Sequence, residues 1–187
     1  MVFGLLMVSN IATAQQTIWN NDPAHSQLGF EVKHTNVSRV RGKFDSFHIV
    51  AKTSKADYSD AQISLTAQVK SINTGVEMRD NHLRTADFFD VEKFPTLTFK
   101  STRLKKVKKI RGRLTGNLTM HGVTRPVTLD VQFFGIITSP MTKKQVAGFR
   151  ITGSVNRSDF GIAPQYLPDF IGNTIYITAD VEFSPQD

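Results

Sequence analysis

The sequence predicts a single all-β domain with one short α-helix, built from about eight long antiparallel strands. Two observations carry this prediction. From Ser26 onward apolar and polar residues alternate with a period of two, which is typical of strands with one buried and one solvated face. The chain of 187 residues, 40% of them hydrophobic, suits one folded core. Strands of about ten residues in such a domain either stack as two sheets or close into a barrel.

The N-terminus carries a short apolar run over residues 2–8, and a small-x-small pattern ends at Ala14. We therefore predict a signal peptide over 1–14 and a mature domain over 15–187; a disordered leader is the alternative. The run is too short to span a bilayer, which needs about 20 apolar residues. Because the first basic residue is Lys33, we expect the signal peptide to be incomplete and residue 1 not to be the true start. The absence of cysteine favours a bacterial periplasmic protein.

The first alternating run places Leu28, Phe30, Val32 and His34 on one face. The later runs assign an inner face to Ile63, Leu65, Ala67, Val69, Leu97, Phe99, Leu114, Leu118, Met120, Val127, Leu129, Val131, Phe133, Phe149, Ile151, Val155, Ile175, Ile177, Ala179, Val181 and Phe183. Between Phe44 and Phe47 the alternation slips by one residue, which predicts a bulge or bend.

One segment breaks the alternation. Thr74 and Glu77 have the spacing of a capping box, and we predict a helix from about residue 75 to about residue 90, ending before Pro95. The residues that helical spacing places on one face are Arg79, His82, Leu83, Ala86 and Phe89. This face is apolar at one end and cationic at the other.

Two connections also have a predicted role. Gly122 follows His121 between two apolar runs, so we expect it to supply the positive φ of a hairpin. The irregular segment from Arg157 to Asn173 is long for a compact domain, and its aromatic residues argue against disorder. Such a segment is usually functional.

The formal charge of +7 is concentrated in residues 103–113. One interpretation is a transient contact of Lys105, Lys106, Lys108 and Lys109 with an anionic membrane surface. The other is a solvated hairpin whose lysines prevent strand edges from pairing with other chains, and we favour it. We do not expect nucleic acid as a partner, because the segment lacks interleaved aromatic residues and the predicted signal peptide indicates export.

Known catalytic patterns are absent from the sequence. The five histidines show no metal-ligand spacing, the chain has no cysteine, and no nucleophile elbow or phosphate-binding glycine loop occurs. Asp80 and His82 lie two apart on the predicted helix and so point to different sides, and Asp80 is better explained as a surface partner of Arg84. We expect no catalytic residues, no metal and no cofactor, and keep a hydrolase using His82 as an alternative.

Several sequence blocks together resemble the YceI-like family of periplasmic polyisoprenoid-binding proteins. The blocks are residues 22–26 (DPAHS), 30–34 (FEVKH), 42–44 (GKF), 79–83 (RDNHL), 87–90 (DFFD), 94–95 (FP), 116–126 (GNLTMHGVTRP) and 157–162 (RSDFGI). This resemblance implies an eight-stranded, lipocalin-like antiparallel β-barrel with a helix against it. It also implies an amphiphilic ligand in the interior: an isoprenoid quinone, a polyprenyl phosphate or a fatty-acid-like lipid.

On this basis we predict which residues contact the lipid. Those assigned to the tail are Phe30, Val32, Phe44, Leu83, Phe88, Phe89, Phe99, Leu118, Met120, Phe133, Phe149, Phe160, Phe170 and Ile177. Those assigned to the head group are Arg79, His82, His34 and Arg157. The rival to this carrier is a ligand-free structural or stress-response barrel that mediates protein interactions. The sequence leaves open whether the chain forms a homodimer.

Overall fold

The computed structural model describes residues 16–55 and 57–186, so the predicted signal peptide over 1–14 lies outside the described residues. The strands of this part of the chain are β1 (Thr17–Asn21), β2 (Gln27–His34), β3 (Ser38–Phe44), β4 (Phe47–Thr53), β5 (Gln62–Gln68), β6 (Ile72–Asn73), β7 (Thr96–Lys108), β8 (Arg111–Met120), β9 (Val123–Thr138), β10 (Gln145–Asn156) and β11 (Ile171–Pro185). The helices are α1 (Glu77–Arg84) and two short 3-10 helices, Val69–Ser71 and Arg157–Phe160.

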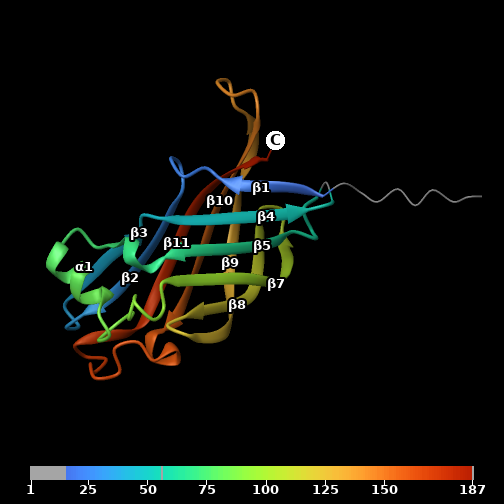
Figure 1. Ribbon diagram of the computed structural model, residues 1–187. Helices are drawn as coiled ribbons and strands as arrows, with labels where there is room; N and C mark the ends of the chain where they lie inside the picture. The colour runs from blue at the N-terminus through green and yellow to red at the C-terminus, as the bar shows by residue number, and fades with distance from the viewer. Residues whose placement is uncertain (1–15, 56, 187) are drawn as a thin grey trace, which may run out of the picture.

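The strands close into a barrel (Figure 1). Within the described residues the order β1-β4-β5-β7-β8-β9-β10-β11 returns to β1 through a β1–β11 pairing, which gives a ring of eight antiparallel strands. This confirms the predicted fold class and decides for a barrel over two stacked sheets. Every neighbouring pair in the ring is antiparallel, so the backbone hydrogen bonds of the wall are satisfied by adjacent strands.

Part of the sheet leaves this ring. Strand β11 pairs with β1 through Phe183–Pro185 and with β2 through Ile171–Asp180, and the sheet continues from β2 to β3 and β6. The predicted irregularity between Phe44 and Phe47 is confirmed as the break between β3, which pairs with β2, and β4, which pairs with β1. Helix α1 lies beside β2 and β3 at one end of the barrel (Figure 1), and its main contacts are with β6.

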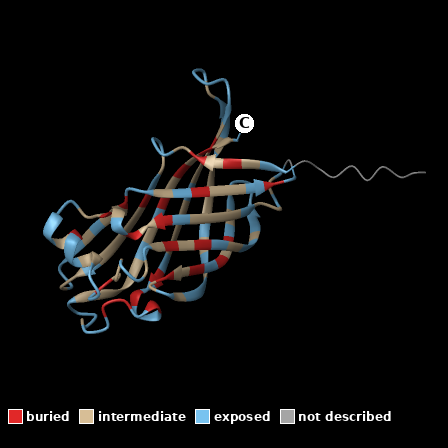
Figure 2. Ribbon diagram, in the orientation of Figure 1, coloured by how far each residue is buried: buried red, intermediate tan, exposed pale blue. Residues whose placement is uncertain are grey.

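The two ends of the barrel differ. We call one the helix end, where α1, the segment 85–95, the β8–β9 turn and the segment 157–170 meet; His121 Nδ1 at this turn lies 3.1 Å from the Phe160 carbonyl oxygen. The other is the closed end, where the β7–β8 and β9–β10 turns lie and the rings of Phe133, Phe149 and Phe183 pack together. Buried residues alternate with exposed ones along the strands between them (Figure 2). Among the described residues, no helix is both long and apolar enough to cross a bilayer.

Helix α1 is shorter than predicted. It begins at Glu77 instead of about residue 75 and ends at Arg84 instead of about residue 90. Thr85 is extended and its hydroxyl donates to the His82 carbonyl, which ends the helix. Because consecutive helical residues point about 100° apart, leaving the helix here is what allows both Phe88 and Phe89 to reach the barrel interior.

Two predicted contacts of the helix are also wrong. The Thr74 hydroxyl does not cap Glu77 but donates to Asp80 Oδ1 at 2.5 Å, and the Thr74 N–H donates to the same oxygen at 2.8 Å. Asp80 is buried and is no surface partner of Arg84. The Arg84 guanidinium instead donates to the carbonyls of Lys70 and Ile72 at 2.9 Å. These contacts fix α1 against β6, which gives the RDNHLR block a structural role.

Candidate functional site

The barrel encloses an apolar cavity that reaches from its middle to the helix end. The space within it that water-sized spheres can occupy is about 160 Å³, and the cavity opens to solvent. The described residues that line it are Leu28, Gly29, Phe30, Val32, Phe44, Ile49, Ile63, Leu65, Leu83, Phe88, Phe89, Leu97, Phe99, Leu114, Leu118, Met120, Val127, Leu129, Ile151, Val155, Arg157, Ile162, Ile171, Ile175, Ile177 and Ala179. Arg157 is the one polar side chain in this set. The cavity therefore suits a hydrocarbon and offers almost no hydrogen bonds.

Two glycines keep aromatic rings close to the barrel wall. Phe30 lies directly opposite Gly42, and a Cβ at position 42 would come within 2.4 Å of Phe30 Cζ. A Cβ at Gly116 would come within 2.4 Å of Phe99 Cζ. Each ring therefore lies over a glycine and not across the barrel axis. Eight-stranded barrels can be filled by their own side chains, and these two arrangements help to keep the interior open.

Ten of the predicted tail residues line this cavity: Phe30, Val32, Phe44, Leu83, Phe88, Phe89, Phe99, Leu118, Met120 and Ile177. Their placement agrees with the alternation, because they lie on inward-facing strand positions or on the segment around α1. Their contact with a lipid stays a prediction.

Four predicted tail residues lie elsewhere. Phe133 and Phe149 face inward but pack against each other and Phe183 at the closed end, with ring centroids 5.1 and 5.8 Å apart along this row. Phe160 is buried in the core at the helix end outside the cavity lining, and Phe170 is half exposed. For Phe133 and Phe149 the cause is that alternation assigns a face but not a position along the barrel axis. Phe160 and Phe170 lie in the irregular segment, where no alternation places them.

Arg157 lines the cavity, but its guanidinium has no free donor for a head group. The side chain is 5% exposed, and all five N–H groups of an arginine are accounted for. They donate to the backbone carbonyls of Gly172, Ile162, Ala163, Tyr166 and Ile171. Burial lowers the pKa of this guanidinium from its ordinary value. The expectation that Arg157 binds the head group is corrected: it holds the loop that follows it.

Replacing Arg157 with methionine is expected to destabilise the fold by about 3 kcal/mol or more, because buried carbonyls would lose their donors. Thermal unfolding and limited proteolysis within 162–171 measure this. Arg125→Met is the matched control, since among the described residues the exposed Arg125 donates to one carbonyl, that of Asp159 at 3.1 Å. Equal stabilities of the two variants would contradict the role of Arg157.

The three other predicted head-group residues do not line the cavity. Arg79 donates to the hydroxyl and carbonyl of Thr74. His82 Nε2 lies 3.0 Å from Asp87 Oδ2 on the surface, and its ring lies edge-on to Phe88. His34 packs against Phe170 with centroids 5.7 Å apart. Each is engaged by protein groups at the helix end.

A row of rings nevertheless connects two of these histidines with the cavity. It runs from His82 to Phe88, Tyr166, Phe170 and His34, with successive centroids 5.0, 5.4, 5.9 and 5.7 Å apart. Phe88 belongs to the cavity lining, whereas Phe170 is exposed. The row thus extends from the cavity to the surface at the helix end.

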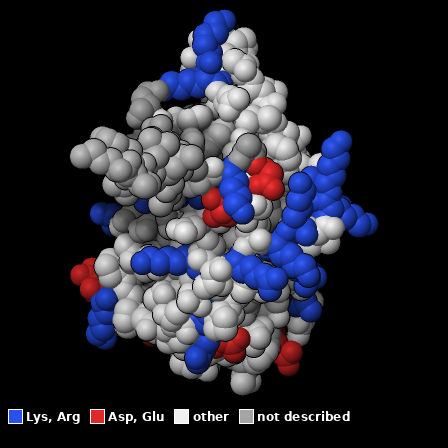
Figure 3. Space-filling model, turned by 90° about the vertical axis from the view of Figure 1, so that its right-hand side faces the viewer, with Lys and Arg blue, Asp and Glu red and all other residues white. Residues whose placement is uncertain are grey.

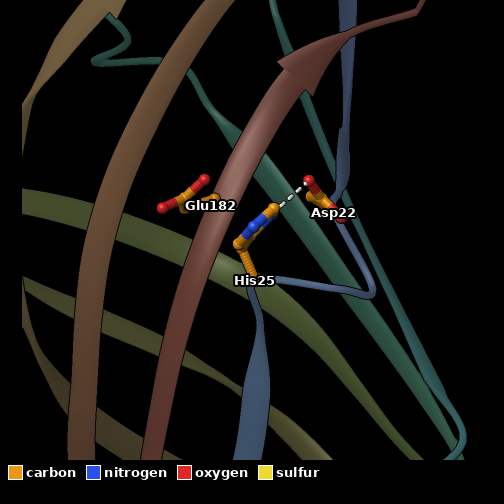
Figure 4. A group of neighbouring side chains, drawn as sticks. All are labelled: Asp22, His25 and Glu182. Carbon is orange, nitrogen blue, oxygen red and sulfur yellow. Dashed lines mark hydrogen bonds and ion pairs between the residues drawn. The ribbon is translucent and has the colours of Figure 1, made fainter.

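A cluster of His25, Asp22 and Glu182 lies outside the cavity (Figure 4). One potential ligand atom of each lies within 4.8 Å of the others, an arrangement that could hold a metal ion and that sequence spacing did not predict. The Asp22 carboxylate already accepts from the Ala24 N–H and lies 2.8 Å from His25 Nδ1. These contacts form the turn between β1 and β2, which explains the DPAHS block structurally.

The same cluster predicts a pH dependence. The hydrogen bond to Asp22, followed by the charges of Asp22 and Glu182, raises the pKa of His25, and the His25 contact and the Ala24 N–H lower the pKa of Asp22. The contribution of His25 to folding stability is fully present below the ordinary histidine pKa and is lost as the pH rises through the raised pKa. The Asp22 contribution is present above the ordinary aspartate pKa and is lost as the pH falls. The stabilisation from both Asp22 and His25 is therefore fully present between about pH 4 and about pH 6.5.

Asp22→Asn is therefore expected to shift the pKa of His25 down toward its ordinary value. Titration of the His25 ring signals by NMR measures the shift, and His48, on β4, serves as the internal reference. An unchanged His25 titration would show that Asp22 is not its main partner.

Sequence reasoning missed much of the aliphatic lining. Ile63, Leu65, Leu129 and Ile151 were assigned to the inner face, yet the predicted site favoured aromatic residues. Alternation alone would have included them. Ile162 and Ile171 carry no such pattern, because they lie in or next to the irregular segment that Arg157 organises.

Fold and cavity together define a lipocalin-like barrel with an apolar interior. The YceI-like domain profile matches residues 19–183, and the chain belongs to the YceI-like family. It is 37% identical over 167 residues to the UPF0312 protein SA2479 of Staphylococcus aureus (strain N315), covering 87% of this chain and 95% of that protein.

Two solved structures are similar to this fold. The Campylobacter jejuni YCEI protein is 30% identical with a TM-score of 0.75, covering 83% of this chain and 90% of that one. A polyisoprenoid binding domain from Saccharophagus degradans implicated in plant cell wall breakdown is 15% identical with a TM-score of 0.64, covering 90% and 98%. The second likeness concerns the fold alone.

Proposed function

We propose that the protein binds a long-chain isoprenoid lipid, such as an isoprenoid quinone or a polyprenyl phosphate, in its barrel and carries or sequesters it in the periplasm. The observation that carries this proposal is a cavity in the barrel interior that is lined almost wholly by carbon. The polyisoprenoid binding domain with the same fold supports the ligand class. The predicted signal peptide and the cysteine-free sequence support the location.

The energetics suit a chain ligand. Burial of a CH₂ group contributes about 0.8 kcal/mol, so a tail of about twenty carbons could supply about 16 kcal/mol before entropic costs. Tail burial alone therefore suffices for tight binding. Selectivity among lipids then has to come from tail length and from the head group.

The head group stays outside the cavity in this proposal. A polar head in an apolar cavity would lose its hydrogen bonds to water, and the donors of Arg157 are all engaged. The lipid enters at the helix end, and the row of rings from His82 to His34 lies where the head would emerge. His82, His34 and Arg79 remain candidates for contacts with the head outside the cavity.

We infer a binding role over a catalytic one. His82 and Asp87 form an exposed pair, and the described cavity beside them lacks the polar cleft that a hydrolase using His82 needs. A transient contact of Lys105, Lys106, Lys108 and Lys109 with anionic membranes, the less favoured interpretation of these residues from the sequence, is compatible with this proposal. A homodimer is not required by it.

Lipid extracted from gently purified protein tests the proposal directly. We expect mass spectrometry to find isoprenoid lipid in near-stoichiometric amount. Protein that is reproducibly empty after expression in cells containing such lipids would refute the carrier and favour the structural barrel.

Blocking the cavity should abolish this binding. Ile151→Trp places a large ring in the lining, whereas Thr152→Trp, on the next residue of β10, points to the opposite face. We expect the first variant to lose bound lipid and the second to keep it, measured by native mass spectrometry on folded protein. Equal lipid content in both would place the ligand outside the barrel.

A smaller change tests the glycine arrangement. Gly42→Ala should push the Phe30 ring into the cavity, reducing bound lipid and destabilising the fold by about 1–3 kcal/mol. Gly148→Ala is the control, because a Cβ there meets only ordinary contacts at 3.6 Å and beyond. Lipid content and the thermal midpoint are the two measurements; an unaffected Gly42→Ala protein would contradict the arrangement.

A further inference from the structure

We propose that the protein docks on anionic bilayers with its closed end, through the β7–β8 hairpin, so that the helix end with its cavity points away from the membrane. The charge of the chain is the first observation. Residues 103–113 contain seven basic residues and no acidic one, which equals the net charge of +7. The other 16 Lys and Arg residues balance the 16 Asp and Glu residues. The whole excess charge is therefore in one hairpin.

These charges are exposed at one end of the molecule. Lys105, Lys106, Lys108 and Lys109 are all exposed, and basic side chains gather on this end in Figure 3. Within the described residues, one ion pair is found on this hairpin, between Arg113 and Asp130 at 3.6 Å. Hydrogen bonds from Ser59 are the main cause that lowers the pKa of Asp57, and the charge of Lys106 is one of the smaller causes. The other like charges of the hairpin repel one another, and a surface of anionic headgroups relieves that repulsion.

The hairpin also exposes large apolar side chains. Val107 is 54% exposed and Ile110 is 47% exposed, and Ile110 forms the turn between the two strands. Met141 in the neighbouring β9–β10 turn is 90% exposed. Apolar side chains interleaved with lysines suit the boundary between headgroups and acyl chains, whereas an acidic soluble protein would need only the charges. The combination of lysines and exposed apolar side chains therefore favours a bilayer over an acidic protein as the partner.

The position of the hairpin fixes the orientation. Strand β8 runs from Arg111 at the basic turn to Met120 at the helix end, where the following His121 lies beside Phe160. The interior next to the hairpin is filled by Phe133 and its neighbours, and the Phe133 N–H donates to the Ile110 carbonyl at 2.8 Å. A molecule bound by this hairpin presents its cavity to the solvent and to a second protein or membrane. Only this consequence for lipid transfer rests on the proposed function.

Edge protection is the competing explanation of the lysines. Strand β7 pairs with β5 only as far as Lys100, so its remaining residues form an edge on that side among the described strands. Lysines on such an edge discourage pairing with other chains. This explanation gives no reason for Val107 and Ile110 to be exposed, and it predicts self-association instead of lost membrane binding when the lysines are replaced.

Vesicle binding tests the proposal. The full chain is mixed with vesicles of phosphatidylcholine containing phosphatidylglycerol, and with vesicles of phosphatidylcholine alone. We expect binding to the former that weakens with salt. Replacing Lys105, Lys106, Lys108 and Lys109 with glutamine should lower the affinity by at least about a hundredfold.

The matched control removes the same number of charges elsewhere, by replacing Lys33, Lys70, Lys93 and Lys100 with glutamine. It should retain most of the binding. Equal loss in both variants would show that net charge and not this hairpin decides binding. Retained vesicle binding of the hairpin variant, accompanied by dimers in size-exclusion chromatography, would establish edge protection and overturn the proposal.

Orientation is measured separately, and the cysteine-free sequence makes this simple. Ile110→Cys and Leu167→Cys, the latter at the helix end, are each labelled with an environment-sensitive dye. We expect vesicles carrying quencher lipids to quench the label at position 110 and not that at 167. The reverse pattern would overturn closed-end docking. Lipid content measured on the same samples keeps this result distinct from a failure of the proposed carrier function.

Discussion

The architecture depends on the short pairing that closes the barrel. Strand β1 meets β11 through only three residue pairs, Trp19 with Pro185, Asn20 with Ser184 and Asn21 with Phe183. Without them the ring would remain open, with β1 and the C-terminal part of β11, residues 181–185, as edges. The residues of β1 that close the barrel include two buried polar side chains with hydrogen-bond donors that no described residue accepts. Trp19 Nε1 and Asn21 Nδ2 are buried and find no hydrogen-bond partner among the described residues, although Asn21 Oδ1 accepts from the Ile49 N–H at 2.7 Å. The hydrophobic packing of β1 outweighs this loss.

The same strand, β11, closes the barrel at one end and borders the cavity at the other. Strand β11 changes its partner from β2 to β1 along its length. At the helix end the barrel is therefore extended by β2, β3 and β6, and α1 with its following segment lies beside these strands. This extended part contains the cavity, while the narrow closed end is filled by aromatic rings. One partner change in one strand therefore separates a solid half that stabilises the fold from a hollow half that can hold a ligand.

Much of the fold was predictable, because a period of two is a local property of strands. The runs around Leu65, Leu118 and Ile177 indicated inward faces, and the slip between Phe44 and Phe47 marked a true strand break. The head-group assignments were less successful for a physical reason. Arg157 has the sequence context of a ligand contact, but whether its donors are free depends on five carbonyls brought to it by a loop without periodicity. The role of Asp80 failed similarly, since its partner Thr74 lies before the helix and not along it.

The separation of charge from cavity is the property that connects these parts. A cavity opening that itself touched an anionic membrane would need a rim that is both apolar and basic. Here, the helix end carries the row of rings from His82 to His34, and three of its cations, Arg79, Arg84 and Arg157, are engaged by Thr74 and by backbone carbonyls. The cations of the closed end are exposed on a hairpin that contributes little to the cavity. Such a division allows the surface charge to change without altering the lipid site, and the lipid site to change without altering the charge.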